Sequence, residues 1–217
     1  PSRWTPTVVR LFWLSVLLLA LAPPDAAAQL PCEADSDPVQ LQMLLEKTVF
    51  SVDVLWLSVR IDGASADSLR SLVRSERDED LEASVATTAA VARCATSQLD
   101  FVRDVSLDRF VGGIRESSRA ALEAGLIEAS TFHTIDENVE GWYAFLEGRG
   151  VADGDRMTYR IRGDTLNIRY RSAGGELLLD RVDVGEAEAR SVLAGYFAPG
   201  SDFRSGLLDA LFRIDGG

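Results

Sequence analysis

The stretch at residues 98–122 constrains the fold most, because its hydrophobic period changes from two to about 3.6 within a few residues. In its first part, apolar residues alternate with polar ones, which is typical of a half-buried strand. In its second part, apolar residues recur every three or four positions, which predicts an amphipathic helix. The apolar residues are Leu99, Phe101 and Val105 in the strand and Leu107, Phe110, Val111, Ile114, Ala121 and Leu122 in the helix. A strand that runs almost directly into a helix predicts that the helix lies back on the sheet.

The predicted helix begins well but contains weak points. Ser106 stands where an N-cap residue belongs. Gly112 and Gly113 each cost the helix about 1 kcal/mol relative to alanine. Ser117 and Ser118 interrupt its apolar stripe. A weakened, partly polar helix over a sheet either marks a ligand cleft or is a packed helix with tolerated defects, and the residues leave both interpretations open.

The rest of the chain groups its strands and collects helices beside them. Strands are predicted at residues 46–61, 90–105, 156–161, 165–170 and 176–184, with glycine-containing hairpin turns between the last three. Further helices are predicted at residues 65–77, 130–147, 185–195 and 202–212, and the charged run at residues 77–82 is predicted to be solvated. This order differs from strict strand–helix alternation and predicts an α+β fold, an antiparallel sheet with a layer of helices on one face.

The amino end has the pattern of a targeting segment. Arg3 and Arg10 precede an apolar run at residues 11–22, which is too short to span a bilayer as a helix, and small residues follow at 26–28. We therefore predict a secretory signal peptide at residues 1–28, a polar lead-in at residues 29–38 and one domain at residues 39–214. An uncleaved amino-terminal anchor is the alternative. After cleavage we expect an exported protein, periplasmic or secreted, without a membrane span.

Net charge and cysteine content limit the possible binding partners and the cellular compartment. The formal net charge is −12, which argues against nucleic acid as a partner because an acidic protein is repelled by phosphate backbones. The chain has two cysteines, Cys32 and Cys94. An oxidising compartment would permit a disulfide between them, which would tie the mature amino end to the strand before the central helix. This pairing is a hypothesis at the level of the sequence.

Residue types that carry metal or nucleophile chemistry are scarce. The chain has one histidine, His133, and no Cys-x-x-Cys pair, so its histidine and cysteines cannot build a tetrahedral zinc site by themselves. It also has no Gly-x-Ser-x-Gly elbow and no glycine-rich dinucleotide or phosphate loop. We expect no metal and no cofactor.

Four stretches together resemble a known family. They are KTVFSVDVLWLSV, DFVRDVSLDRFVGGIRESSRAAL, ADGDRMTYRIRGDTLNIRY and ARSVLAGYFAPGSDFRSGLLDALF. In order, they are similar to the first long strand, the strand-into-helix segment, the late hairpin and the closing helices of the bacterial chalcone isomerase-like group. The resemblance covers nearly the whole domain. It implies an open-faced β-sandwich with helices on one side and a mostly apolar ligand cleft between helix and sheet.

The resemblance also implies positions for the family's site residues. The strand threonine falls on Ser51 or Asp53, in a register that stays open, and the helix tyrosine falls on Phe110. The asparagine falls on Ser117, and the serine or threonine of the penultimate helix falls on Val192. The family's arginine has no counterpart, since no arginine occurs between residues 10 and 60. The candidate cleft residues are Ser51, Asp53, Arg103, Phe110, Ile114, Ser117 and Val192.

These departures predict a binding protein rather than an efficient chalcone isomerase. One preorganised oxyanion donor contributes about 2.7–4 kcal/mol to catalysis, and several groups are missing together. Arg103 is the one basic residue placed to substitute for the missing guanidinium, unless it is an ordinary surface arginine. We expect an exported, non-catalytic protein that binds an apolar or amphipathic, fatty-acid-like small molecule in the cleft. Two alternatives stay open: an isomerase or intramolecular lyase with an unknown substrate, and a structural or partner-binding domain with a filled cleft.

Overall fold

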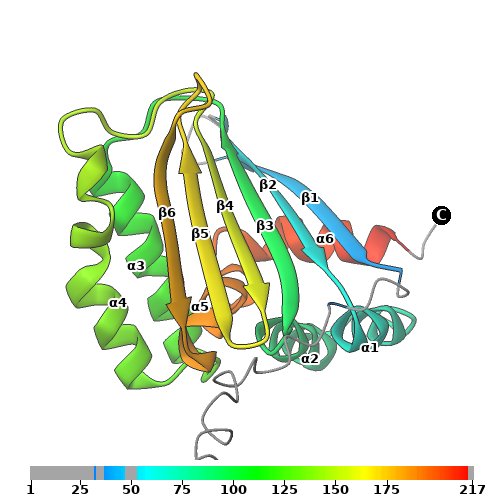
Figure 1. Ribbon diagram of the computed structural model, residues 1–217. Coiled ribbons are helices and arrows are strands. Elements are labelled where there is room, and N and C mark those ends of the chain that lie inside the picture. The colour runs from blue at the N-terminus through cyan, green and yellow to red at the C-terminus, as the bar shows by residue number, and fades with distance from the viewer. Residues whose placement is uncertain (1–31, 33–36, 47–52, 215–217) are drawn as a thin grey trace, which may run out of the picture.

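The computed structural model describes residue 32 and residues 37–46 and 53–214, and these form one antiparallel sheet with helices on one face (Figure 1). The sheet has six strands in the order β1-β2-β3-β4-β5-β6, so each strand pairs with its neighbours in the chain. The strands are β1 (Val39–Glu46), β2 (Asp53–Ile61), β3 (Cys94–Phe101), β4 (Arg156–Arg162), β5 (Thr165–Arg171) and β6 (Leu177–Val184). The predicted α+β class, with an antiparallel sheet under a one-sided helical layer, is confirmed.

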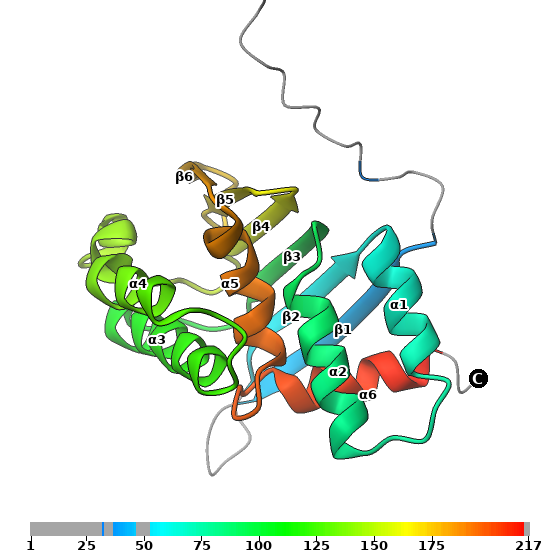
Figure 2. The same ribbon diagram turned by 90° about the horizontal axis from the view of Figure 1, so that it is seen from below.

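The helices gather in groups along the covered face. They are α1 (Ala64–Leu72), α2 (Glu79–Ala90), α3 (Leu107–Glu123), α4 (Ala129–Trp142), α5 (Glu186–Phe197) and α6 (Arg204–Arg213), with a 3₁₀ turn η1 (Ala144–Leu146) after α4. Figure 2 shows α1, α2 and α6 at the β1 end of the sheet, α3 and α4 at the β6 end, and α5 between them. The two ends of the sheet are therefore covered by different helices.

The single strand predicted at residues 46–61 is wrong, because this region contains the end of one strand and the whole of another. β1 pairs with β2 in antiparallel fashion, from Val39 opposite Ile61 to Glu46 opposite Asp53. Residues 47–52, which join the two strands, lie outside the described part of the chain. Burial alternates along β1: Val39, Leu41, Met43 and Leu45 are buried, and the residues between them are more exposed.

Most of the charged run at residues 77–82 is exposed, as predicted, and it also opens α2, which the sequence analysis did not predict. The Asp78 carboxylate accepts a hydrogen bond from the Leu81 N–H at 2.8 Å, which caps the first turn. Three acidic residues, Glu79, Asp80 and Glu82, occupy that first turn, where the helix dipole favours negative charge. The prediction missed this helix because its signal is a cap followed by small residues rather than a strong apolar stripe.

Helix α3 begins where the sequence predicts, but it does not lie back on the sheet along its length. The Ser106 hydroxyl accepts from the Arg109 N–H at 3.4 Å and caps the helix. Phe110 packs edge-on against Phe101 of β3, with ring centroids 5.9 Å apart, and this anchors the start of the helix to the sheet. Beyond Phe110, α3 packs on α4 and α5. Most of its predicted sheet-facing stripe therefore faces other helices and the space between them and the sheet.

Ser117 has a packing reason for being small. A Cβ atom added to Gly195 of α5 would lie 3.4 Å from the Ser117 Cβ, so the two helices approach closely at this point. A larger side chain at either position would push α3 and α5 apart.

The structure joins Cys32 and Cys94 in a disulfide, with Cα atoms 5.6 Å apart. Cys94 is the first residue of β3, so the bond ties Cys32 to the start of that strand. This is the pairing that the sequence permitted for an oxidising compartment.

Candidate ligand-binding site

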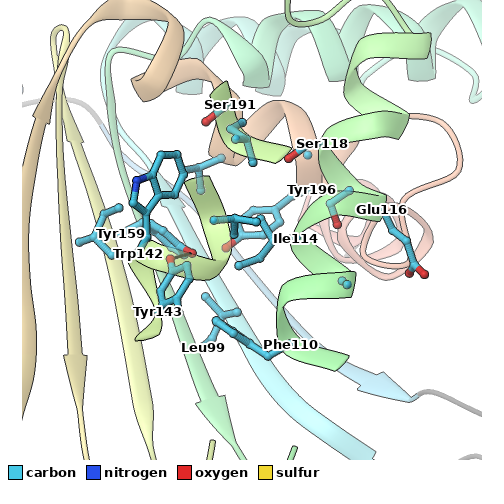
Figure 3. Close-up of a pocket in the computed structure, with 18 of the residues that line it drawn as sticks. Leu99, Phe110, Ile114, Glu116, Ser118, Trp142, Tyr143, Tyr159, Ser191 and Tyr196 are labelled. Carbon is cyan, nitrogen blue, oxygen red and sulfur yellow. Dashed lines mark hydrogen bonds between the residues drawn. The ribbon is translucent and has the colours of Figure 1, made fainter. Parts of the chain in front are cut away.

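A large cavity lies between the covered face of the sheet and helices α3, α4 and α5 (Figure 3). Its volume is about 990 Å³. Protein sites for small molecules commonly measure about 300–1,000 Å³, so this cavity is large enough for a ligand of drug or lipid size. It lies between the sheet and the part of α3 that does not rest on it.

The cavity lining is mostly apolar and comes from both layers. Strands β3 and β5 supply aliphatic and aromatic side chains from their helix-facing sides, and α3, α4 and α5 supply the opposite wall. The principal apolar residues are Leu99, Phe101, Phe110, Ile114, Ile135, Val139, Trp142, Ile168 and Val192. A lining of this kind favours a ligand that can bury a hydrocarbon or aromatic body.

The two glycines of α3 leave space in the cavity and are not part of a turn. Gly112 and Gly113 both line it, and a Cβ added to either would meet no atom within 4 Å. Gly113 lies three positions after Phe110 and four before Ser117, so the three share one face of the helix. These glycines lower the helix propensity of α3, and the absence of their side chains adds to the space in the cavity.

Three tyrosine hydroxyls supply polar groups to this apolar space. The hydroxyl oxygens of Tyr143 and Tyr159 lie 3.1 Å apart and share a hydrogen bond. Tyr196 of α5 also lines the cavity, and Figure 3 shows its ring pointing toward the other two. We call these three residues the tyrosine cluster. Burial raises the pKa of all three phenols, so each stays neutral at ordinary pH and can both donate and accept hydrogen bonds.

The cavity contains a guanidinium that the sequence analysis did not expect. Arg181 of β6 lies over the Trp142 ring, with its guanidinium carbon 4.1 Å from the ring centroid. Its Nε donates to the Asp183 carboxylate at 2.8 Å. The expectation that Arg103 is the one basic residue at this site is therefore wrong, because Arg109 and Arg181 also line the cavity. Arg181 is nevertheless already occupied by a carboxylate and an aromatic face.

The structure brings five of the seven candidate residues together. Arg103, Phe110, Ile114, Ser117 and Val192 all line the cavity. Arg103 is half-buried in the short segment between β3 and α3.

The other two candidates are not placed at the cavity. Ser51 lies outside the described residues. Asp53 begins β2, and its side chain is not described.

Sequence reasoning missed the tyrosine cluster as a unit, although each member had a local signal. Tyr143 follows the buried Val139 by four positions, at the C-cap of α4. Tyr159 lies two positions from both Met157 and Ile161 in β4, so it shares their buried face. Tyr196 lies in the buried last turn of α5. The convergence of the three depends on the order of strands and helices, which local patterns do not supply.

A buried polar network lies outside the cavity lining. The buried Asp155 carboxylate accepts from Arg149 at 2.9 and 3.2 Å, from the Tyr170 hydroxyl at 2.7 Å, and from the N–H groups of Ala152 and Ala173 at 2.9 Å each. Burial acts to raise the pKa of Asp155, but these hydrogen bonds outweigh it and hold the pKa below its usual value. The network fixes the loop that joins the α4–η1 region to β4.

The described residues offer neither a metal site nor a membrane-spanning helix. No group of three or more His, Cys, Asp or Glu side chains there is placed to hold a metal ion. No helix in residues 37–46 and 53–214 has the length and hydropathy needed to cross a bilayer.

The chain is similar to known proteins in fold but not in sequence. No protein-family model matches the chain, and no curated protein is similar to it in sequence. Among solved structures, the chain is similar to a fatty-acid binding protein from Arabidopsis thaliana, with a TM-score of 0.47 and 14% sequence identity over 81% of this chain and 91% of that chain. Figures 1 and 2 show an open antiparallel sheet with helices on one face, which is the architecture that the resemblance to chalcone isomerase-like proteins implies. The cavity between sheet and helices also agrees with that resemblance.

Proposed function

We propose that this protein binds an apolar or amphipathic small molecule in the cavity between α3, α4, α5 and the sheet, without catalysing a reaction. The observation that carries the proposal is the cavity itself, about 990 Å³ with a mostly apolar lining. Each buried methylene of a ligand contributes about 0.8 kcal/mol, so a chain of ten to twelve carbons supplies ample binding free energy.

The side chains around the cavity support binding rather than catalysis. Phe110 and Val192 occupy positions where the family resemblance implies polar groups, and neither has a hydrogen-bond donor. The raised pKa of the tyrosine cluster prevents these phenols from acting as bases near neutral pH. Arg181 is engaged by Asp183 and Trp142. An isomerase therefore has less support than a carrier or receptor for a small molecule.

We further propose that the protein works in an exported location, after removal of residues 1–28. The pattern of the amino end and the Cys32–Cys94 disulfide both support this, because such bonds persist mainly in oxidising compartments. Expression with and without residues 1–28, followed by fractionation, tests it, and a full-length chain retained uncleaved in the cytoplasm would contradict it.

Titration with diphenylhexatriene tests the binding proposal. This fluorescent probe is a hydrocarbon without polar atoms, so its binding reports an apolar cavity and nothing else. We expect saturable one-site binding to the wild-type protein. In Gly113→Phe the new ring enters the cavity from the face shared with Phe110, and we expect the Kd to rise about tenfold or more, equivalent to roughly 1.4 kcal/mol.

Gly141→Phe is the matched control. Gly141 also lies in a helix and is exposed, and a Cβ there would meet no atom within 4 Å, but it does not line the cavity. Its Kd should equal that of the wild type. Absence of binding to the wild-type protein, or equal loss of binding in both variants, would overturn the proposed function.

A further inference from the structure

The polar centre of the cavity consists of uncharged hydroxyl groups. Tyr143 at the C-cap of α4, Tyr159 of β4 and Tyr196 of α5 bring their phenols together from three separate parts of the chain (Figure 3). Ser97 pairs across the strands with Tyr159 and is 2% exposed, so it adds a fourth buried hydroxyl beside them. A hydroxyl group both donates and accepts, so this cluster matches a ligand end group that does the same.

The charged side chains of the lining form a predominantly acidic set. They comprise the carboxylates of Asp104, Asp108, Glu116, Asp183, Glu188 and Asp202, and the guanidiniums of Arg103, Arg109 and Arg181. Carboxylates outnumber guanidiniums by six to three. The whole chain carries a formal net charge of −12, so the field of the protein adds to this local excess. The negative net charge therefore disfavours the approach of an anionic ligand.

None of the three guanidiniums is placed to hold a buried carboxylate. Arg181 is neutralised by Asp183 and covered by Trp142. Arg109 is exposed and Arg103 is half-buried, so water solvates both. An ion pair with a solvated arginine contributes little to binding. Moving a ligand carboxylate into an apolar space without a desolvated partner costs far more than such a pair returns.

We infer that the ligand ends in an uncharged hydroxyl or carbonyl group that hydrogen-bonds to the tyrosine cluster, and that carboxylates are disfavoured. This inference rests on the proposed function, since it assigns the chemistry of a ligand in the same cavity. It specifies an amphiphile of the fatty-alcohol or ketone type in place of a free fatty acid. The apolar body of the ligand lies against α3 and α4, and its polar end lies among the three phenols.

Competition between three ligands with the same chain tests the inference. Diphenylhexatriene is bound first and then displaced, at pH 7.5 and below micelle-forming concentrations, by dodecanol, dodecanoate or dodecyltrimethylammonium. The three differ only in a neutral, negative or positive end. We expect dodecanol to displace the probe at a concentration at least about tenfold lower than dodecanoate, and also lower than the cation.

The double variant Tyr143→Phe/Tyr159→Phe removes both members of a hydrogen-bonded pair while it keeps their rings, so neither partner is left unsatisfied. Affinity for dodecanol should fall about fivefold relative to affinity for diphenylhexatriene, as expected for one lost hydrogen bond that only dodecanol can make. The single variant Tyr196→Phe is a second route to the same measurement, since it removes the third hydroxyl of the cluster.

The outcomes separate the two proposals. If diphenylhexatriene does not bind the wild-type protein, the proposed function fails. If it binds but dodecanoate or the cation displaces it as well as dodecanol does, the inference fails and the proposed function stands. If the tyrosine variants bind dodecanol as tightly as the wild type, the assignment of the polar end to the tyrosine cluster is overturned.

Discussion

The two ends of the same sheet are covered in opposite ways. At the β1 end, α6 packs directly along β1 and its residues Leu207, Leu208 and Leu211 are at most 1% exposed. At the β6 end, α3 and α4 lie beyond a cavity, and the residues facing it, such as Ile114 and Trp142, are only half-buried. We call these the packed end and the hollow end. The difference suggests that one end supplies most of the stability and the other supplies the binding site.

Two glycines show how the difference arises from local sequence. At Gly206 of α6, an added Cβ would lie 2.8 Å from the Met43 Cε and 3.1 Å from its Cβ, so the absence of a side chain lets the helix approach the sheet. At Gly113 of α3, an added Cβ would meet nothing within 4 Å. The same residue type therefore permits close packing at one end and leaves space at the other.

Polar anchors replace apolar packing at the hollow end. The Asp155 network ties the loop before β4 to β5 through Tyr170, and the Tyr143–Tyr159 hydrogen bond joins α4 to the sheet across the cavity. Such hydrogen bonds connect elements of the fold without filling the cavity with side chains.

The largest expected effect is on a core leucine at the packed end. Leu207→Ala should lower the free energy of unfolding by about 2–5 kcal/mol, because it leaves a void in a fully buried site. Ile114→Ala at the hollow end should cost about 1 kcal/mol or less, since it only enlarges an existing cavity and alanine favours the helix. Urea denaturation measures both, and equal losses would break the comparison.

Loss of the Cys32–Cys94 disulfide should lower stability without changing ligand affinity. Its sequence separation is 62 residues, so replacing both cysteines, as Cys32→Ser/Cys94→Ser, should lower the free energy of unfolding by about 2–4 kcal/mol. The bond lies outside the cavity lining, so the Kd for diphenylhexatriene should not change. Thermal unfolding of the wild type with and without reductant checks the first point, with the double variant as the control that reductant cannot affect.

Substitution of Asp155 measures how much its hydrogen-bond network contributes to stability. Asp155→Asn should cost about 2–3 kcal/mol near neutral pH, less than a fully buried ion pair because Arg149 is about one-third exposed. The folded-state pKa of Asp155 is depressed, so its contribution is fully present above the unfolded-state pKa of about 3.9 and is lost as pH falls through the folded value. The stability gap between wild type and variant should thus be constant above about pH 5 and shrink below about pH 4.

The matched control for this experiment is Asp153→Asn. Asp153 is exposed in the same loop, and its carboxylate makes no hydrogen bond with another described residue. Its variant should match the wild type within about 0.5 kcal/mol. A gap that grew on acidification for Asp155→Asn would contradict the sign of its pKa shift.

The smallest effect compares the two glycines directly. Gly206→Phe should lower the free energy of unfolding by about 1–3 kcal/mol through overpacking against Met43. Gly113→Phe should leave stability unchanged or raise it by less than about 1 kcal/mol, because phenylalanine favours the helix more than glycine does and the space is open. Differential scanning calorimetry of the pair would resolve this, and similar destabilisation in both would mean that the space beside Gly113 is not open.

The sequence predicted much of this architecture where local signals were strong. The N-cap Ser106 and the apolar stripe located α3, and the glycine turns located the hairpins of β4, β5 and β6. The boundary between β1 and β2 was missed because residues 47–52 contain no glycine, proline or asparagine to mark a turn. The apolar stripe of α3 showed that one face is covered, but periodicity does not give the distance to the covering layer.

The site was predicted in part for the same reason. Phe110, Ile114 and Ser117 share a helix face, and that face does line the cavity. Arg181 and Tyr196 come from elements late in the chain, and only the strand order brings them to α3 and α4. Residues that meet through topology rather than spacing cannot be identified as one site from a single sequence.

Native mass spectrometry of freshly purified protein tests the central claim most directly, because it detects occupancy of the hollow end without a chosen ligand. We expect wild-type ions that carry a bound small molecule, which organic extraction then identifies as an uncharged amphiphile. The same molecule should be absent or depleted in Gly113→Phe and retained in Gly141→Phe. Bare protein in all three samples, together with no uptake of diphenylhexatriene, would contradict the account.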